Sequence, residues 1–169
     1  MRYRDYLQNY AIKKSALRLP IGTHQMGGLK CKSSPNVPPW LLDWAIVFPT
    51  HTHIRVTEYF VPQAHPNHGL AIRKHFCYHY GPTTDVDHKA MPETKDNAQT
   101  IIRIDQDRFG PHIHYKGQDH VEQNRIAGNF IIQEAEVFEF IEAIRKHQES
   151  GASFEELLSF TLNDGGTNE

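Results

Sequence analysis

The sequence predicts an α+β fold, in which a twisted antiparallel β-sheet carries one long helix packed on its apolar face. Two observations predict it. Between residues 53 and 115, apolar side chains recur at every second position, which is the period of a β-strand. Between residues 131 and 148 they recur at the helical period instead. Strands followed by a helix favour an antiparallel sheet whose second face is left to water or to a ligand.

The length and composition are those of one globular protein. The chain has 169 residues, of which 22% are charged and 38% hydrophobic, and a net charge of -2. It has no apolar run of the roughly 18 residues that a membrane span needs, and its basic start lacks the apolar stretch of a secretory signal. The two cysteines suggest no disulfide framework. We therefore expect a cytoplasmic protein with no membrane partner.

Residues 1–39 are predicted to be a basic N-terminal arm and linker. Tyrosines at helical spacing indicate a short helix that ends before Pro20, and the glycines and prolines of residues 20–39 indicate an irregular segment. Residues 1–32 hold seven Lys and Arg against one acid, whereas residues 119–169 hold eleven acids against three bases. A basic arm could follow a phosphate backbone, although two solvated segments of opposite sign are the simpler interpretation.

Residues 40–162 are predicted to be a single α+β domain. Its strand segments are found by their alternation and are residues 53–60, 70–80, 100–105 and 112–115. The segment 81–99 is long, polar and punctuated by prolines, so we expect a loop there.

The last third of the chain is predicted to be helical. After the long helix of residues 131–148, Gly151 is a predicted stop. Ser153 and Glu156 form a capping box for a short final helix over residues 154–160. Residues 163–169 have no apolar content and are predicted to be a frayed tail.

Histidine clustering on the strands is the strongest functional signal. The chain has twelve histidines, and most fall between residues 51 and 120. If the polar sides of the strands align, one face of the sheet collects His51, His53, Arg55, Arg73, His75, His79, Arg103, Asp105, His112 and His114. The alignment depends on strand register, because a shift of one residue would turn the histidines of a strand to the other face.

This face suits general acid/base chemistry. An imidazole can accept or donate a proton near neutral pH, and arginines can hold a phosphate. We predict a metal-independent endoribonuclease in which His112 and His114 transfer protons and Asp105 orients an imidazole. Arg103 and Arg108 are the predicted phosphate-binding residues. His53 and His75 are further candidates for binding the substrate, which would be RNA.

Other interpretations of the same residues stay open. His51, His53, His112 and His114 could bind zinc or another divalent transition metal, and the run HTHIRVTE resembles the first half of a cupin motif. Alternatively, the chain could be a binding module for nucleic acid or protein without catalytic activity. A third interpretation is that the histidines are solvated strand-surface residues without a function.

The order of the segments around residues 103–114 also resembles a known family. Arg103, Ile104 and Asp105 end a strand, a Pro-His-Ile-His segment follows at residues 111–114, and the helix EAEVFEFIEAI comes next. This arrangement resembles the TumE family of toxins from bacterial toxin–antitoxin systems, over about residues 44–146. The resemblance implies a small bacterial toxin that acts on RNA or translation and is neutralised by an antitoxin protein with a helix-turn-helix domain. The oligomeric state is not implied.

Overall fold

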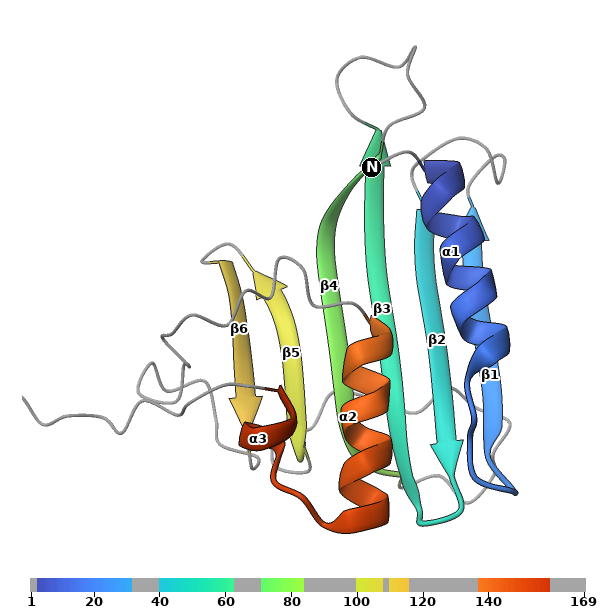
Figure 1. Cartoon of the computed structure of the whole chain (residues 1–169). Helices are drawn as coiled ribbons and strands as arrows, with labels where there is room; N and C mark the ends of the chain where they lie inside the picture. Colours follow the sequence, from blue (N-terminus) through green and yellow to red (C-terminus); the bar gives the residue numbers. More distant parts are fainter. Residues whose placement is uncertain are drawn as a thin grey trace, which may run out of the picture.

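A six-stranded antiparallel sheet forms the centre of the fold in the computed structural model of the chain (Figure 1). The structure describes residues 3–31, 40–62, 71–83, 100–107, 110–115 and 137–158. The strands are β1 (His24–Cys31), β2 (Trp40–Phe48), β3 (Thr52–Pro62), β4 (Ala71–Pro82), β5 (Ile102–Asp107) and β6 (Gly110–Tyr115). They pair in the order of the sequence, so each strand lies beside the one that precedes it. The expected α+β class with an antiparallel sheet is therefore confirmed.

β2 is buried along almost its whole length, on both faces of the sheet. Its sequence WLLDWAIVF is an uninterrupted apolar run except for Asp43, as is typical of a strand covered on both sides. β1 pairs with it from His24 to Cys31. The prediction of an irregular segment over residues 20–39 is therefore wrong for β1, because backbone pairing with β2 makes an extended strand of a sequence that contains two consecutive glycines. The sheet thus begins before residue 40.

β3 and β4 follow the alternation that the sequence predicts, except at one β-bulge. Ile54 and Val56 pair with Tyr80 and Tyr78, and all four side chains belong to the buried core. The register shifts between Tyr59 and Phe60, so that Arg73 pairs with Phe60. The bulge turns the side chain of Arg73 to the face opposite His75.

Within the described ranges, three helices accompany the sheet: α1 (Tyr3–Ala16), α2 (Val137–Ser150) and α3 (Phe154–Leu158). α1 is the short helix predicted before Pro20. α1 and α2 lie side by side against the same face of the sheet, with α1 over β1 and β2 (Figure 1). Tyr10 of α1 meets both Trp44 of β2 and Phe138 of α2, with ring centroids 5.7 and 5.5 Å apart. We call this side of the sheet the helix face.

α2 and α3 end and begin as the sequence predicts. Gly151 has a φ of 70°, which favours glycine, and its amide donates to the His147 carbonyl at 2.8 Å, closing the end of α2. The Glu156 amide donates to the Ser153 hydroxyl at 3.3 Å, which is one half of the predicted capping box. The predicted loop beyond residue 83, the first turn of the long helix and the tail 163–169 lie outside the described residues. In the described part of the chain, no helix is long and apolar enough to cross a membrane.

Candidate functional site

The strand register brings most of the predicted site residues to the face of the sheet opposite the helices. Arg55 on β3 pairs with His79 on β4, His79 with Arg103 on β5, and Arg103 with His114 on β6. Paired residues of an antiparallel sheet point to the same side, and so do residues two positions apart. We call this side the histidine face, formed by His53, Arg55, His75, Cys77, His79, Arg103, Asp105, His112 and His114.

Asp105, Arg103 and His114 form a connected cluster at the β5–β6 end of this face. Arg103 Nε lies 2.9 Å from Asp105 Oδ2, and Arg103 Nη2 lies 2.9 Å from His114 Nε2. His114 Nε2 also lies 3.5 Å from Asp105 Oδ1. Arg103 and His114 are only 9% and 8% exposed, so the three groups interact in a partly desolvated setting in which ionic contacts are strong.

The contacts of this cluster indicate how Nε2 of His114 takes part in hydrogen bonding. A guanidinium has donors only, so His114 Nε2 accepts the hydrogen bond from Arg103 and carries no proton. A proton arriving at Nε2 would break that hydrogen bond and could be shared with Asp105 Oδ1 instead. His114 therefore has a partner in either protonation state, which is what a group that accepts and releases a proton requires.

The other predicted catalytic and phosphate-binding residues lie near this cluster or outside the described side chains. His112 pairs with Asp105 on the same face, although its side chain lies outside the described ones. His75 is exposed, and its Nδ1 lies 3.1 Å from the Gln106 carbonyl of β5. Arg108 lies outside the described residues.

His53 and His79 form a buried pair at a different place on the face. Their ring centroids are 5.1 Å apart, and they are 1% and 3% exposed. Burial lowers the pKa of His53 from 6.5 to about 4 and that of His79 to about 3, with Arg55 adding to both shifts. Both imidazoles are thus neutral at pH 7, so His53 offers no positive charge to a phosphate.

Asp43 of β2 adds an ionic contact to the neighbouring part of this face. Arg55 Nε and Lys30 Nζ lie 3.1 and 3.2 Å from its carboxylate oxygens. Burial acts to raise the pKa of Asp43, but the hydrogen bonds and charges of Arg55 and Lys30 outweigh it and hold the pKa below its usual value. Asp43 was not among the residues predicted from the sequence. A carboxylate within an otherwise apolar strand is itself a signal of a buried ion pair.

Cys77, between His75 and His79 on β4, is half-buried. Burial, with a smaller contribution from Asp105, raises the pKa of its thiol to about 12. The thiol is therefore protonated at neutral pH and is a poor nucleophile.

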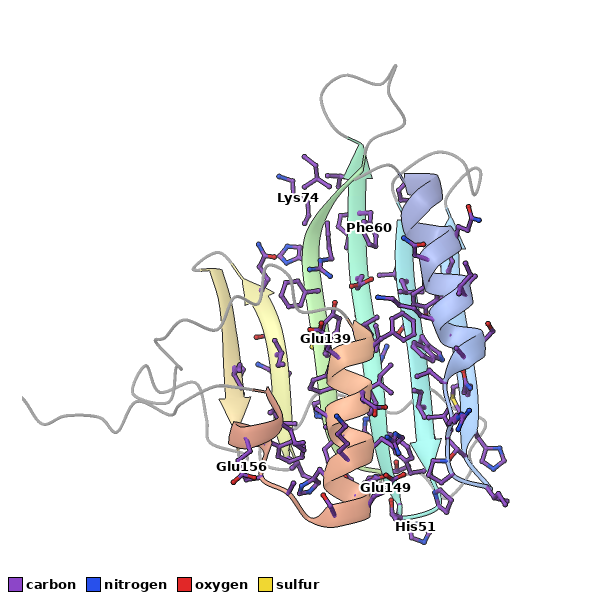
Figure 2. The ribbon with its side chains drawn as sticks, viewed as in Figure 1. His51, Phe60, Lys74, Glu139, Glu149 and Glu156 are labelled. Atoms are coloured by element: carbon purple, nitrogen blue, oxygen red, sulfur yellow. The ribbon has the colours of Figure 1, made fainter. Side chains whose placement is uncertain are left out.

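The residues of the alternative metal site lie on strands far apart in the sheet. His51 is exposed in the turn between β2 and β3, with a φ of 57°, at the end of the sheet where α2 also ends (Figure 2). His53 follows on β3, whereas His112 and His114 are on β6, with β4 and β5 between them. Among the described residues, no three His, Cys, Asp or Glu side chains group closely enough to hold a metal ion. The four-histidine site includes the undescribed side chain of His112 and stays a prediction.

Arg73, which the alternation assigned to the histidine face, lies on the helix face instead. The bulge places its Nη1 2.8 Å from both Glu58 Oε1 and the Tyr78 hydroxyl. That hydroxyl donates to Glu58 Oε1 at 2.5 Å. This cluster explains how Glu58 can be 0% exposed among apolar neighbours.

Comparison of the chain with protein-family models, with curated proteins and with solved structures found no match in any of the three.

Proposed function

We propose that this chain is a metal-independent endoribonuclease whose active site is built around the Asp105–Arg103–His114 cluster. The observation that carries the proposal is that His114 Nε2 contacts both Arg103 and Asp105. Arg103 can donate to the unprotonated nitrogen, and Asp105 can accept from the protonated one. β6 is an edge strand among the described strands, so a substrate could approach His112 and His114 from beyond the sheet.

In this proposal His114 acts as the general base and His112 as the general acid. His114 takes the proton of the ribose 2′-hydroxyl, the 2′-oxygen attacks phosphorus, and His112 gives a proton to the departing 5′-oxygen. As His114 becomes protonated, it exchanges Arg103 for Asp105 as its partner. The released Arg103 guanidinium can then bind the phosphate as negative charge develops on it, with Arg108 and His75 as further contacts.

The biological setting we propose is that of a bacterial toxin. The resemblance to the TumE family around residues 103–114 supports a cytoplasmic protein with an RNA substrate and an antitoxin partner that carries a helix-turn-helix domain. The proposed architecture has α2 covering the apolar face of the sheet. The contact between the rings of Phe140 on α2 and Tyr78 on β4 supports this packing. The basic N-terminal extension would contribute positive charge outside the sheet.

The test is cleavage of a mixed-sequence RNA in excess chelator by the wild type, a His112→Ala/His114→Ala variant and a His51→Asn variant. His51→Asn is the matched control, because it removes an exposed imidazole at a positive φ that asparagine tolerates. We expect wild type and control to cleave equally and the double variant to lose about 100-fold or more. Cleavage that appears only after zinc is added would favour the metal interpretation. Binding of RNA without cleavage under either condition would contradict the proposal and favour a binding module.

The role of Asp105 is tested by the pH dependence of the same reaction. Asp105→Asn keeps the shape of the side chain but removes the negative charge that favours protonated His114. We expect the acidic limb of the rate profile to move to lower pH. A purely structural role would instead lower the rate equally at all pH values.

A further inference from the structure

Two exposed apolar side chains lie together on the histidine face, beside the β-bulge of β3 and β4. Tyr59 is 37% exposed and Ile72 is 40% exposed. Tyr59 pairs with His75, and Ile72 pairs with Val61 two positions beyond Tyr59, so these four side chains point to the same side of the sheet. Scattered single apolar residues on a surface are ordinary, whereas a group of them indicates a surface that contacts another molecule.

The sheet holds the ring of Tyr59 in place and leaves part of it open to solvent. Tyr59 pairs with Leu41 on β2 and with His75 on β4, so its backbone is fixed on both sides. Leu41 is half-buried, and His75 is exposed. Tyr59 and His75 are thus two neighbouring rings that a ligand can reach from the same direction, and we call them the aromatic pair.

The aromatic pair adjoins the proposed active site. His75 Nδ1 lies 3.1 Å from the carbonyl of Gln106, the residue that follows Asp105 on β5. Tyr59 is on β3, and two strand spacings of the sheet separate β3 from β5 by about 10 Å. A ligand that covers Tyr59 and extends across His75 therefore arrives at the Asp105–Arg103–His114 cluster.

Basic side chains flank the aromatic pair. Lys30 on β1 lies in the same row of paired residues as Tyr59, and its side chain is 62% exposed. Asp43 contacts both Lys30 and Arg55, so this group of two bases and one acid keeps a net positive charge. Lys74 is the extra residue of the bulge and is exposed at this end of β4 (Figure 2). The surface around the two rings therefore suits a negatively charged ligand.

Exposed rings interleaved with bases are the features by which a sheet binds single-stranded RNA. Unpaired nucleobases stack on aromatic side chains, while lysine and arginine contact the phosphates. An apolar protein surface would also cover Tyr59 and Ile72, but it would not use the positive charge of Lys30 and Lys74. Charge and continuity with the proposed active site both favour RNA.

We propose that Tyr59 stacks on a nucleobase of single-stranded RNA and thereby positions a neighbouring phosphate of the same strand at the Asp105–Arg103–His114 cluster. Lys30 and Lys74 contact the RNA backbone on either side of the stacked base. This inference rests on the proposed nuclease for the identity of the ligand, and it adds that the substrate is single-stranded. In a duplex the bases stack on one another and have no free face for Tyr59.

The probe is a short, fluorescein-labelled 2′-O-methyl oligoribonucleotide of mixed sequence, which has no 2′-hydroxyl and so cannot be cleaved by the proposed mechanism. Its affinity for the full-length chain is measured by fluorescence anisotropy in excess chelator. Tyr59→Ala should weaken binding about 5–100-fold, whereas Tyr59→Phe and Tyr59→Trp should keep it because they retain an aromatic face. Ile12→Ala removes an exposed apolar side chain on α1 and should leave the affinity unchanged. Lys74→Gln should weaken binding and lower its dependence on salt.

A duplex of the same sequence separates stacking from a general effect on the protein surface. The wild type should prefer the single strand, and Tyr59→Ala should remove that preference by weakening single-strand binding alone. Equal losses for single strand and duplex in a folded Tyr59→Ala variant would overturn the proposal.

Three further outcomes would also overturn it. These are absence of binding by the wild type, an unchanged affinity in Tyr59→Ala, and a loss of affinity in Tyr59→Phe. A change of sedimentation coefficient in Tyr59→Ala, with RNA binding intact, would identify the surface as an interface between copies of this chain instead.

Failure of this inference is distinguishable from failure of the proposed nuclease. RNA cleavage in chelator that Tyr59→Ala does not affect would remove the stacking role and leave the nuclease. Binding that depends on Tyr59, without cleavage of unmodified RNA, would support the stacking role and remove the nuclease.

Discussion

The two faces of the sheet bury their side chains by different means. The helix face is apolar, with Trp44, Ile54 and Val56 fully buried, and the buried Glu58 carboxylate there contacts Arg73 and Tyr78. The histidine face is closed mainly by ion pairs and by imidazoles whose burial keeps them neutral. The stability of the helix face should therefore depend on packed volume, and that of the histidine face on protonation. A substitution on one face therefore has a substitution on the other face as its control.

The largest single effect is expected from truncating the helix face at Trp44. Its side chain is 0% exposed and packs against Tyr10 and Phe138. Trp44→Ala should lower the free energy of unfolding by about 3–5 kcal/mol, through lost burial and a cavity. Urea unfolding at pH 7.5 measures it. His75→Ala, at an exposed position of the other face, should stay within about 0.5 kcal/mol of wild type. Equal losses in the two variants would contradict the comparison.

Protonation of the histidine face should instead lower the free energy of unfolding in acid. His53 and His79 have folded pKa values of about 4 and 3, below the 6.5 of the unfolded chain. Above pH 6.5 both are neutral in either state, so they add no pH dependence. Below it the unfolded chain takes up protons that the folded protein does not, and stability falls by up to about 3 kcal/mol per pH unit until pH approaches 4.

Urea unfolding of the protein at several pH values between 7.5 and 4.5 tests this expectation. His79→Gln should lose about half of the slope that the pair contributes, and His51→Asn should lose none of it. A wild-type unfolding free energy that does not change between pH 6.5 and 4.5 would show that the two rings are not buried in neutral form.

The contrast between a core side and a solvent side also explains which strands and helices could be predicted from the sequence. The alternation of β3 to β6 and the stripe of α2 could be predicted, because strands and helices at a boundary between core and solvent have a periodic pattern. β2 has no such alternation because it is buried on both faces, and its continuous apolar run should have been recognised as a strand. β1 could not be predicted locally. It is a strand through its pairing with β2, although its residues Gly27 and Gly28 indicate a turn.

The candidate site was predictable where it depends on alternation and not where it depends on tertiary contacts. The shared face of Arg103, Asp105 and His114 follows from alternation and a short hairpin. The predicted side of the sheet for Arg73 was wrong, because the sequence of neither strand reveals the β-bulge between them. The burial of His53, and its pairing with His79, depend on register across two strands, which a single sequence does not specify.

Two arginines, one on each face of the sheet, pair with a buried carboxylate. Arg73 bonds Glu58, which is 0% exposed, whereas Arg55 bonds Asp43, which Lys30 also contacts. Arg73→Met should cost about 3 kcal/mol, because it removes the guanidinium that contacts the fully buried Glu58 carboxylate. Arg55→Met should cost about 1 kcal/mol, because Lys30 stays beside Asp43.

A double variant separates lost charge from lost packing. Adding Glu58→Gln to Arg73→Met removes the buried charge, so the pair should recover much of the stability that Arg73→Met alone loses. No recovery would mean that Arg73 stabilises the helix face through its contact with the Phe76 ring, 4.5 Å from the guanidinium carbon, rather than by neutralising Glu58. In that case the helix face would depend on packing even at the Arg73–Glu58 contact, and the contrast with the histidine face would be greater.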